Sequence, residues 1–287
     1  MDIQSLFNQQ INNLTENPSK KEVFRKLTFK KDWQIFDVKD KKIYFIKQAN
    51  TGFVQESNDA LTNKVKILIK KIPFLFQIIY HIVGASFLGT SSKKAIKNIP
   101  RGSVILNLGS GVTSLRDDVI NIDFFPFKNV DMVADISSLP FTDNTADAVI
   151  CEYVLEHVPD PTAIVAEIYR ITKPGALVYI SVPFTASFHS APRDYYRWSK
   201  MGLQEELKSF KEIECKIRSG PGAAIDYALA EFFAILLSFG LKKLHQILFV
   251  IFLILFAPLC WLDYLIGYFP TSENIAYGFY YIGRKNM

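Results

Sequence analysis

The feature that most constrains this chain is a short apolar strand followed by two closely spaced glycines. Residues 104–111 read VILNLGSG, and Asp123 stands twelve positions after Gly111 in the stretch VINIDFFPF. Glycine has no Cβ, so a turn built on Gly109 and Gly111 lets the backbone come close to a ligand. Neighbouring strands of a doubly wound parallel sheet end at one edge, so we expect Asp123 to lie beside this turn.

The pattern indicates a nucleoside-containing cofactor. A carboxylate at this edge can accept hydrogen bonds from the vicinal hydroxyls of a ribose. The dinucleotide fingerprint needs a third glycine, where this chain has Ser114, and an acidic residue about twenty positions further on. Asp123 comes earlier than that. A nucleotide-dependent reductase is therefore a distant alternative.

Further signals follow in a fixed order along the chain. A short strand leads to Asp135, a strand at 146–151 leads towards a helix, and a strand at 177–182 follows a tight turn. Leu139-Pro140-Phe141 follows Asp135, Leu155-Glu156-His157 follows the strand at 146–151, and Lys173-Pro174-Gly175 forms the predicted tight turn. Together with the glycine turn, this succession resembles the class I S-adenosylmethionine-dependent methyltransferases, and most closely the small-molecule group called type 11. The resemblance runs from about residue 100 to about residue 210.

The resemblance implies a Rossmann-like α/β fold with a mixed seven-stranded sheet, an N-terminal extension and an apolar helical insertion near the C-terminus. It also implies S-adenosylmethionine as the cofactor. The methionine portion would contact the backbone of the glycine turn, Asp123 would bind the ribose, Asp135 the adenine amino group, and Ile136 the ring. The remaining implied contacts are Leu108, Gly109, Ser110 and Gly111 in the turn, with Cys151 and Glu152 on the cofactor's other side.

Two residues depart from the family pattern. Asn107 stands where the family usually has Asp or Glu, and Thr113 stands where a third small glycine is common. Asn107 can orient the loop by hydrogen bonds but carries no charge.

Polar and aromatic residues crowd the segment PFTASFHSAPRDYYRWS, which follows the strand at 177–182. This density is typical of an acceptor pocket. The segment resembles members of the same group that carry H-x-x-P-x-D-Y-x-R. His189 and Asp194 are the candidates for a base or for orienting the acceptor. Tyr195 and Arg197 are candidates for binding it, with Arg197 suited to an anionic group.

Two alternatives remain open for these candidates. An ion pair between Asp194 and Arg197 could simply fix the loop, with the tyrosines packed on the sheet. His157, which follows the strand at 146–151, is a third catalytic candidate, and it could equally be a packing or loop-holding group.

Charge and apolar residues are unevenly distributed. Residues 1–101 hold 18 Lys and Arg against 8 Asp and Glu, although the whole chain is only +5, and 49% of its residues are hydrophobic. A basic region beside an apolar segment suggests an anionic membrane surface, although ordinary solvated lysines explain each position singly. No nucleic-acid motif accompanies the charge, so nucleic acid is not an expected partner.

The three cysteines lie far apart, at Cys151, Cys215 and Cys260, without the spacing of metal ligands. No metal is therefore implied. They predict buried thiols in a reducing compartment. No secretory signal opens the sequence. We therefore expect the methyltransferase domain to face the cytoplasm.

The regions around the core at 100–220 carry their own patterns. Within residues 1–63, alternating apolar positions around Asp40-Lys41-Lys42 predict a β-hairpin. Residues 64–99 are mostly apolar with interspersed lysines. This pattern predicts a helical lid over the acceptor site or, as the alternative, an interfacial helix.

The second strong signal lies at 221–270. Residues 247–262 contain no charge, Lys242 and Lys243 precede them, and Trp261, Tyr264 and Tyr268 fall where an aromatic belt would. A crossing needs about 20 apolar residues, so this run is borderline. With the apolar stretch upstream it predicts a helical hairpin that associates with a membrane through residues 227–269. A buried core helix or a homodimer interface is the alternative. Residues 271–287 are expected to form a final edge strand.

These observations predict a membrane-associated methyltransferase on the cytoplasmic side. Its acceptor would be a small molecule, and the apolar segments favour a lipid or a lipid-linked saccharide. The rival hypothesis is a non-catalytic membrane scaffold or partner subunit that retains the fold. Asn107 and Thr113 favour the rival, whereas Asp123 and Asp135 oppose it.

Overall fold

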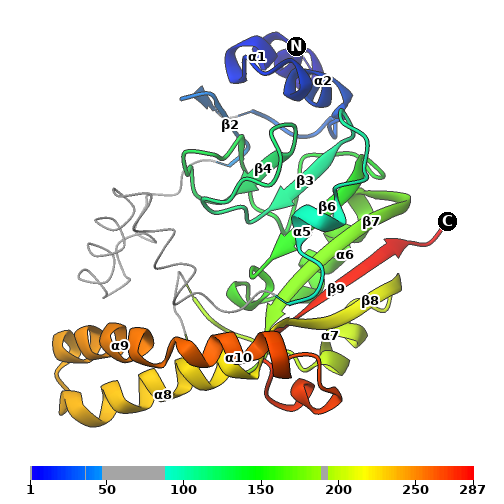
Figure 1. Ribbon diagram of the computed structural model, residues 1–287. Coiled ribbons are helices and arrows are strands. Elements are labelled where there is room, and N and C mark those ends of the chain that lie inside the picture. The colour runs from blue at the N-terminus through cyan, green and yellow to red at the C-terminus, as the bar shows by residue number, and fades with distance from the viewer. Residues whose placement is uncertain (1, 36, 47–87, 189–192) are drawn as a thin grey trace.

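A computed structural model describes residues 2–35, 37–46, 88–188 and 193–287, and one mixed sheet organises them (Figure 1). The strands are β1 (Asp37–Lys39), β2 (Lys42–Tyr44), β3 (Ile105–Leu108), β4 (Ile120–Asp123), β5 (Met132–Val133), β6 (Ala146–Glu152), β7 (Thr172–Pro183), β8 (Phe210–Ser219) and β9 (Gly278–Lys285). Their order is β1-β2-β5-β4-β3-β6-β7-β9-β8.

The central strands β5-β4-β3-β6-β7 are mutually parallel, and β9 runs antiparallel to both β7 and β8. The seven strands from β5 to β8 are the predicted mixed sheet. The predicted strand before the glycine turn and the one that ends at Asp123 appear as β3 and β4, and those predicted at 146–151 and 177–182 appear as β6 and the later part of β7. Their near-continuous apolar character follows from burial on both faces.

Two further strands extend this sheet at one side. β1 and β2 pair antiparallel across Asp40 and Lys41, which both have positive φ, and β2 pairs in parallel with β5. The alternating apolar pattern around this turn predicted the hairpin. It did not indicate that the hairpin would join the main sheet and bring the total to nine strands.

Helices cover the sheet on both faces. α1 (Ile3–Leu14), α2 (Pro18–Lys26), α6 (Pro161–Ile171) and α7 (Lys200–Glu206) contribute to the larger apolar core, while the segment around α5 (Ser92–Ala95) packs on the other face. At the N-terminal end, Phe7 contacts Phe24 and Phe29, and Phe29 contacts Phe141 just after β5. These rings join the N-terminal helices to the core domain.

The apolar insertion forms three helices between β8 and β9. They are α8 (Pro221–Ser238), α9 (Lys242–Phe256) and α10 (Pro258–Ile266), followed by the 3-10 helix η3 (Pro270–Ile275). α8 and α9 form a hairpin that projects past the sheet (Figure 1). The prediction of an edge strand at 271–287 was wrong in one respect, because β9 lies inside the sheet and β8 forms the edge.

The predicted lid at 64–99 lies outside the described residues up to position 87. The described part begins beside β8, where the Leu88 N–H donates to the Arg218 carbonyl at 2.9 Å. Tyr179 and Tyr280 then hold Thr90, through its carbonyl and its N–H respectively.

Candidate active site

The glycine turn follows β3 and lies directly against the end of β4. Gly109 and Gly111 have φ of 63° and 54°, in the region that favours glycine. The Ser110 N–H donates to the Ile122 carbonyl at 3.1 Å, and the Gly111 N–H donates to Asp123 Oδ2 at 2.8 Å. The structure thus joins the two parts of the motif by hydrogen bonds.

Asp123 is 7% exposed at the C-terminal end of β4. Burial raises the pKa of this carboxyl, and the N–H groups of Phe125, 2.9 Å from Oδ1, and of Gly111 offset part of the rise. A carboxylate has about four lone-pair positions, so Asp123 keeps the capacity to accept from two hydroxyls. Ser110 Oγ is buried and has no hydrogen-bond partner in the described part of the chain. This donor and acceptor set fits a ribose-containing cofactor.

Asp135 and Ile136 follow β5, next in the sheet. The Ala134 N–H donates to the Asp123 carbonyl at 3.1 Å, so the two strand ends lie side by side. Asp135 is exposed and accepts from the Ser137 N–H and hydroxyl at 2.9 and 2.7 Å. Ile136 is 8% exposed. Both lie at the same edge as Asp123, as the adenine-binding hypothesis requires.

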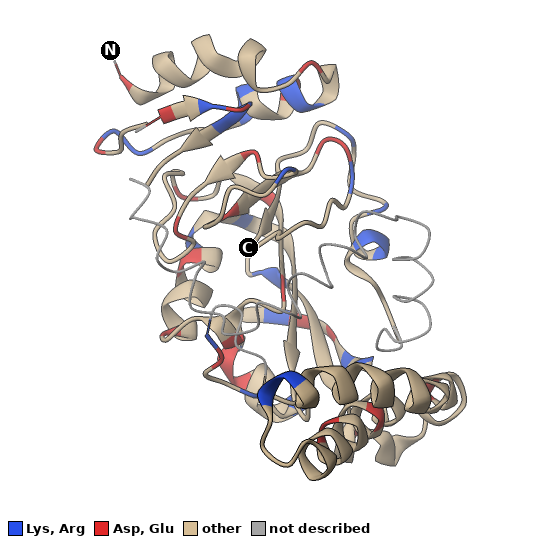
Figure 2. Cartoon of the chain, turned by 90° about the vertical axis from the view of Figure 1, so that its left-hand side faces the viewer, with Lys and Arg blue, Asp and Glu red and all other residues tan. Residues whose placement is uncertain are grey.

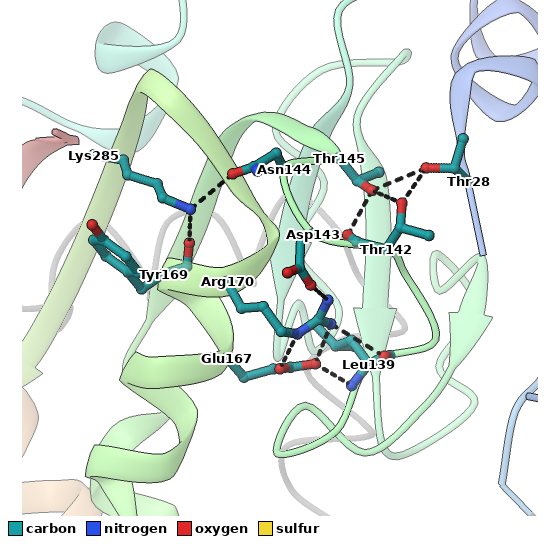
Figure 3. A network of polar contacts seen from close by, with 10 residues as sticks. All are labelled: Thr28, Leu139, Thr142, Asp143, Asn144, Thr145, Glu167, Tyr169, Arg170 and Lys285. Atoms are coloured by element: carbon teal, nitrogen blue, oxygen red, sulfur yellow. Dashed lines mark hydrogen bonds and ion pairs between the residues drawn. The ribbon is translucent and has the colours of Figure 1, made fainter. Parts of the chain in front are cut away.

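A partly buried ionic network holds the loop after β5 (Figure 3). Glu167 on α6 accepts from the Leu139 N–H at 2.6 Å and pairs with Arg170 at 2.7 Å. Arg170 also pairs with Asp143 at 2.7 Å. Nearby hydroxyl contacts tie this loop to the N-terminal region through Thr28, Thr142 and Thr145. The network fixes the loop that carries Asp135.

The structure separates the two candidates at the end of β6. Cys151 is fully buried in the larger core and is the register partner of Leu108 on β3. Glu152 points to the opposite face, as successive strand residues do. Its Oε2 accepts from the Ser92 hydroxyl at 2.7 Å, and Arg218 lies 3.7 Å from Oε1. Cys151 therefore lies beside β3, the strand that leads into the glycine turn, while Glu152 ties α5 to the sheet.

The segment after β7 returns to cover the end of β6. His157 Nδ1 lies 2.5 Å from the Arg193 carbonyl, and the Tyr195 N–H donates to the Glu156 carbonyl at 2.7 Å. Tyr195 is 43% exposed. The structure thus brings His157 next to the segment that carries the acceptor candidates. His189 lies outside the described residues.

Arg197 clamps this segment. Its guanidinium forms a bidentate pair with Asp194 at 2.5 and 2.6 Å and donates to the carbonyls of Ala186 and Ser187. Hydrogen bonding and the charge of Asp194 raise the pKa of Arg197. Because Nε and both terminal nitrogens are engaged, these contacts favour the loop-fixing interpretation of the pair over recognition of an acceptor phosphate.

Sequence reasoning gave no role to Glu156, Tyr153 or Tyr277. Glu156 is fully buried beneath the 193–197 segment, and burial raises its pKa to about 8. Tyr153 has a φ of 53°, rare for a residue other than glycine. The triplet Leu155-Glu156-His157 was visible in the sequence, but only the fold shows that Glu156 is buried as fully as the apolar Leu155.

Comparisons with known proteins show similarity to methyltransferases over part of the chain. A family model described as a methyltransferase domain matches residues 114–180. The ubiquinone/menaquinone biosynthesis C-methyltransferase UbiE of Desulfotalea psychrophila is 49% identical over 43 residues, 15% of this chain and 18% of that protein. An uncharacterized methyltransferase of Schizosaccharomyces pombe is 40% identical over 94 residues, 33% of this chain and 34% of that protein. The matches thus span about a third or less of these relatives.

Among solved structures, phosphoethanolamine N-methyltransferase 2 of Haemonchus contortus in complex with S-adenosyl-L-methionine aligns with a TM-score of 0.44 and 17% identity. The alignment covers 72% of this chain and 56% of that one. The matched residues 114–180 thus belong to a methyltransferase domain.

Proposed function

We propose that this protein transfers a methyl group from S-adenosylmethionine to a small, membrane-resident acceptor. The observation that carries the proposal is the joined pair of Asp123 and the glycine turn at the carboxyl edge of the sheet. When bound, the cofactor supplies a methyl group on a positively charged sulfur. The protein's own task is to hold donor and acceptor in line, which can supply several kcal/mol of the barrier.

Each part of the site has a defined task in this proposal. The backbone of Gly109 and Gly111 would hold the methionine portion, Asp123 the ribose, and Asp135 with Ile136 the adenine. The 193–198 segment, fixed by Arg197, closes over the end of β6 and shields the acceptor side from water. Two relatives are demethylmenaquinone methyltransferases by name, and this supports a small-molecule acceptor.

The surface of the α8–α10 helices supports membrane association. Between Ile225 and Phe269 the exposed side chains are almost all apolar, and they include Phe232, Ile251 and Leu265 at 58%, 52% and 68% exposure. Lys242 and Lys243, at the turn between α8 and α9, are the only charged residues exposed in this range. Figure 2 shows charged residues gathered on the sheet domain and sparse on these helices. So large an apolar surface is unusual on a soluble monomer.

The interior of the same helices is small and polar. Ala223, Ala230 and Ala234 are buried, and a Cβ added at Gly222 would lie 2.1 Å from the Leu259 carbonyl oxygen on α10. Such close contact through small residues is typical of helices packed in lipid.

Buried polar groups lie in the interior of these helices, whose exterior is apolar. Asp263 on α10 accepts from the N–H groups of Gly222 and Ala223 at 2.6 and 3.0 Å, and Cys260 donates to Asp226. An apolar exterior around a polar interior favours a lipid environment over water. By length and composition, within the described residues, α8 could cross a bilayer, and α9 with α10 could form a second crossing bent by 45°.

The proposed location is the cytoplasmic side of a membrane. Both ends of the inserted helices return to the sheet, so the catalytic domain stays on one side. Cys151, Cys215 and Cys260 are buried and free, which suits a reducing compartment. A lipid or lipid-linked saccharide is the acceptor class that this placement favours.

Calorimetry with S-adenosylhomocysteine tests the cofactor site. We expect saturable binding to the detergent-solubilised protein and its loss in Asp123→Ala. Unchanged binding in that variant would refute the assigned site. An absence of binding by folded wild-type protein would favour the alternative, a membrane scaffold that retains the fold.

Flotation with vesicles tests the membrane surface. Wild-type protein should float with phosphatidylcholine vesicles and more strongly when phosphatidylglycerol is added. The double variant Lys242→Gln and Lys243→Gln should lose only the anionic increment, whereas Phe232→Ser with Leu265→Ser should lose both. A detergent-free, monodisperse homodimer that does not float would show that a second copy covers these helices.

A further inference from the structure

The loop that follows β6 lies directly beside the glycine turn. A Cβ placed on Gly109 would come 2.3 Å from Val154 Cγ2, so Val154 fills the space behind the turn. Tyr153, just before it, takes a φ of 53° and donates its N–H to the Ser181 carbonyl at 2.9 Å. A left-handed backbone in a bulky residue is costly, and such strain clusters at functional sites. Residues 153–157 are thus held next to the proposed methyl donor.

Glu156 is an exception among the buried carboxylates. It is fully buried, yet neither carboxyl oxygen accepts a hydrogen bond from another residue in the described ranges. By contrast, Asp118 pairs with Arg116, and Asp123 and Asp263 each accept from two N–H groups. Leaving a buried polar group unpaired costs about 1–3 kcal/mol, so its retention calls for an explanation.

The surroundings of Glu156 bring its pKa close to neutral pH. Burial raises the pKa of Glu156 to about 8, while its own backbone N–H and Arg197 lower it and Asp194 raises it. His157 Nε2 lies 3.9 Å from Oε1. Burial raises the pKa values of Tyr153 and Tyr277, and the charge of Glu156 adds a smaller contribution to each. A group with a pKa near the working pH exchanges protons efficiently.

The cluster formed by Glu156, Tyr153 and Tyr277 adjoins the apolar helices. The Tyr277 ring packs 5.1 Å from that of Tyr227 on α8, and the Tyr277 N–H donates to the Ser219 carbonyl at 2.9 Å. Tyr277 therefore stands between the base of the helical hairpin and Glu156. An amphiphile with its tail along α8 would direct its polar head towards this cluster.

We propose that Glu156 receives the proton that an O–H or N–H group of the acceptor loses when that group is methylated. This inference rests on the proposed function. In the step, the acceptor's oxygen or nitrogen forms a bond to the methyl carbon, and the methyl–sulfur bond breaks with its electron pair remaining on sulfur. The acceptor's proton passes to the Glu156 carboxylate. The assignment makes the acceptor an amphiphile with a hydroxyl or amine head, rather than one methylated at carbon.

The test compares Glu156→Gln and Glu156→Asp with the wild type. Glu206→Gln is the control, because Glu206 is a carboxylate on the protein surface that hydrogen-bonds Thr162. Methyl transfer from radiolabelled S-adenosylmethionine to a native-membrane lipid extract is measured across pH, and S-adenosylhomocysteine binding is measured by calorimetry. We expect Glu156→Gln to lose about 100-fold or more in rate, together with the acidic limb of the pH profile, where protonation of Glu156 lowers the wild-type rate. Glu156→Asp should recover part of the rate, and every variant should bind S-adenosylhomocysteine normally.

The outcomes separate the two proposals. Wild-type protein that methylates nothing refutes the proposed function itself. Wild-type activity with an unchanged rate and pH profile in Glu156→Gln, or a product methylated at carbon, overturns the role of Glu156 alone. Loss of cofactor binding in Glu156→Gln would assign Glu156 a structural role instead. Stability against urea gives a readout that needs no acceptor, because removing a carboxyl with a raised pKa should stabilise the protein increasingly as pH rises.

Discussion

The contact between Gly109 and Val154 makes a quantitative prediction about the glycine turn. Gly109 and Gly111 both have positive φ, but only Gly109 is crowded: an added Cβ would meet Val154 at 2.3 Å, while at Gly111 nothing lies within 4 Å. Gly111→Ala should therefore cost only the left-handed strain of alanine, about 1 kcal/mol. Gly109→Ala should cost that strain plus the overlap, about 3 kcal/mol in total.

A double-mutant cycle with Val154→Ala isolates the overlap, because this substitution removes both methyl groups that the new Cβ meets. In the Val154→Ala background, Gly109→Ala should cost only about 1 kcal/mol, which gives a coupling of about 2 kcal/mol. Urea denaturation in detergent at one pH provides the free energies of unfolding. Equal losses for the two glycine variants, or no recovery on truncating Val154, would refute the reasoning. Gly111→Ala in the Val154→Ala background is the matched control and should show no coupling.

Three further predictions concern single polar groups. Burial tends to raise the pKa of Glu167, but the hydrogen bond from Arg170 and that from a loop N–H lower it overall. Its stabilising contribution is therefore present above its unfolded pKa and lost as the pH falls through the folded value. Glu167→Gln should lower the unfolding free energy by about 2 kcal/mol at neutral pH, and urea titrations should show this difference shrinking in acid. Asp263→Ala, which leaves two N–H groups at the start of α8 without their acceptor, should cost about 2 kcal/mol by the same assay, and an unchanged value would contradict that capping role. Asn17→Ala removes the side-chain cap of α2 and should cost about 1 kcal/mol in thermal or urea unfolding, with Asn13→Ala as the exposed control.

The cofactor side of the site could be predicted from the sequence because local patterns determine it. Gly109, Gly111 and Asp123 are fixed by strand ends and a turn, and the parallel sheet brings them together. The periodic strands of the core were located for the same reason.

The acceptor side could be predicted only in part, because long-range packing arranges it. The sequence placed Asp194 and Arg197 three residues apart but left two roles open, and only the fold shows the guanidinium occupied by a bidentate pair and two carbonyls. The burial of Glu156 depends on the 193–197 segment lying over it. The position of β9 inside the sheet, next to the edge strand, depends on pairing with β7 and β8 after more than fifty intervening residues. No local pattern encodes these contacts.

The register of β8 and β9 has a further consequence. Ser219 and Gly278 are direct partners, so the chain leaves the sheet and re-enters it at adjoining points. The whole apolar insertion is therefore a cassette whose two chain connections lie side by side. A short hairpin turn could replace it without altering the ladder below. Mechanically, a tilt that the surroundings impose on the cassette reaches the sheet at that junction, beside Tyr277 and the proposed acceptor site.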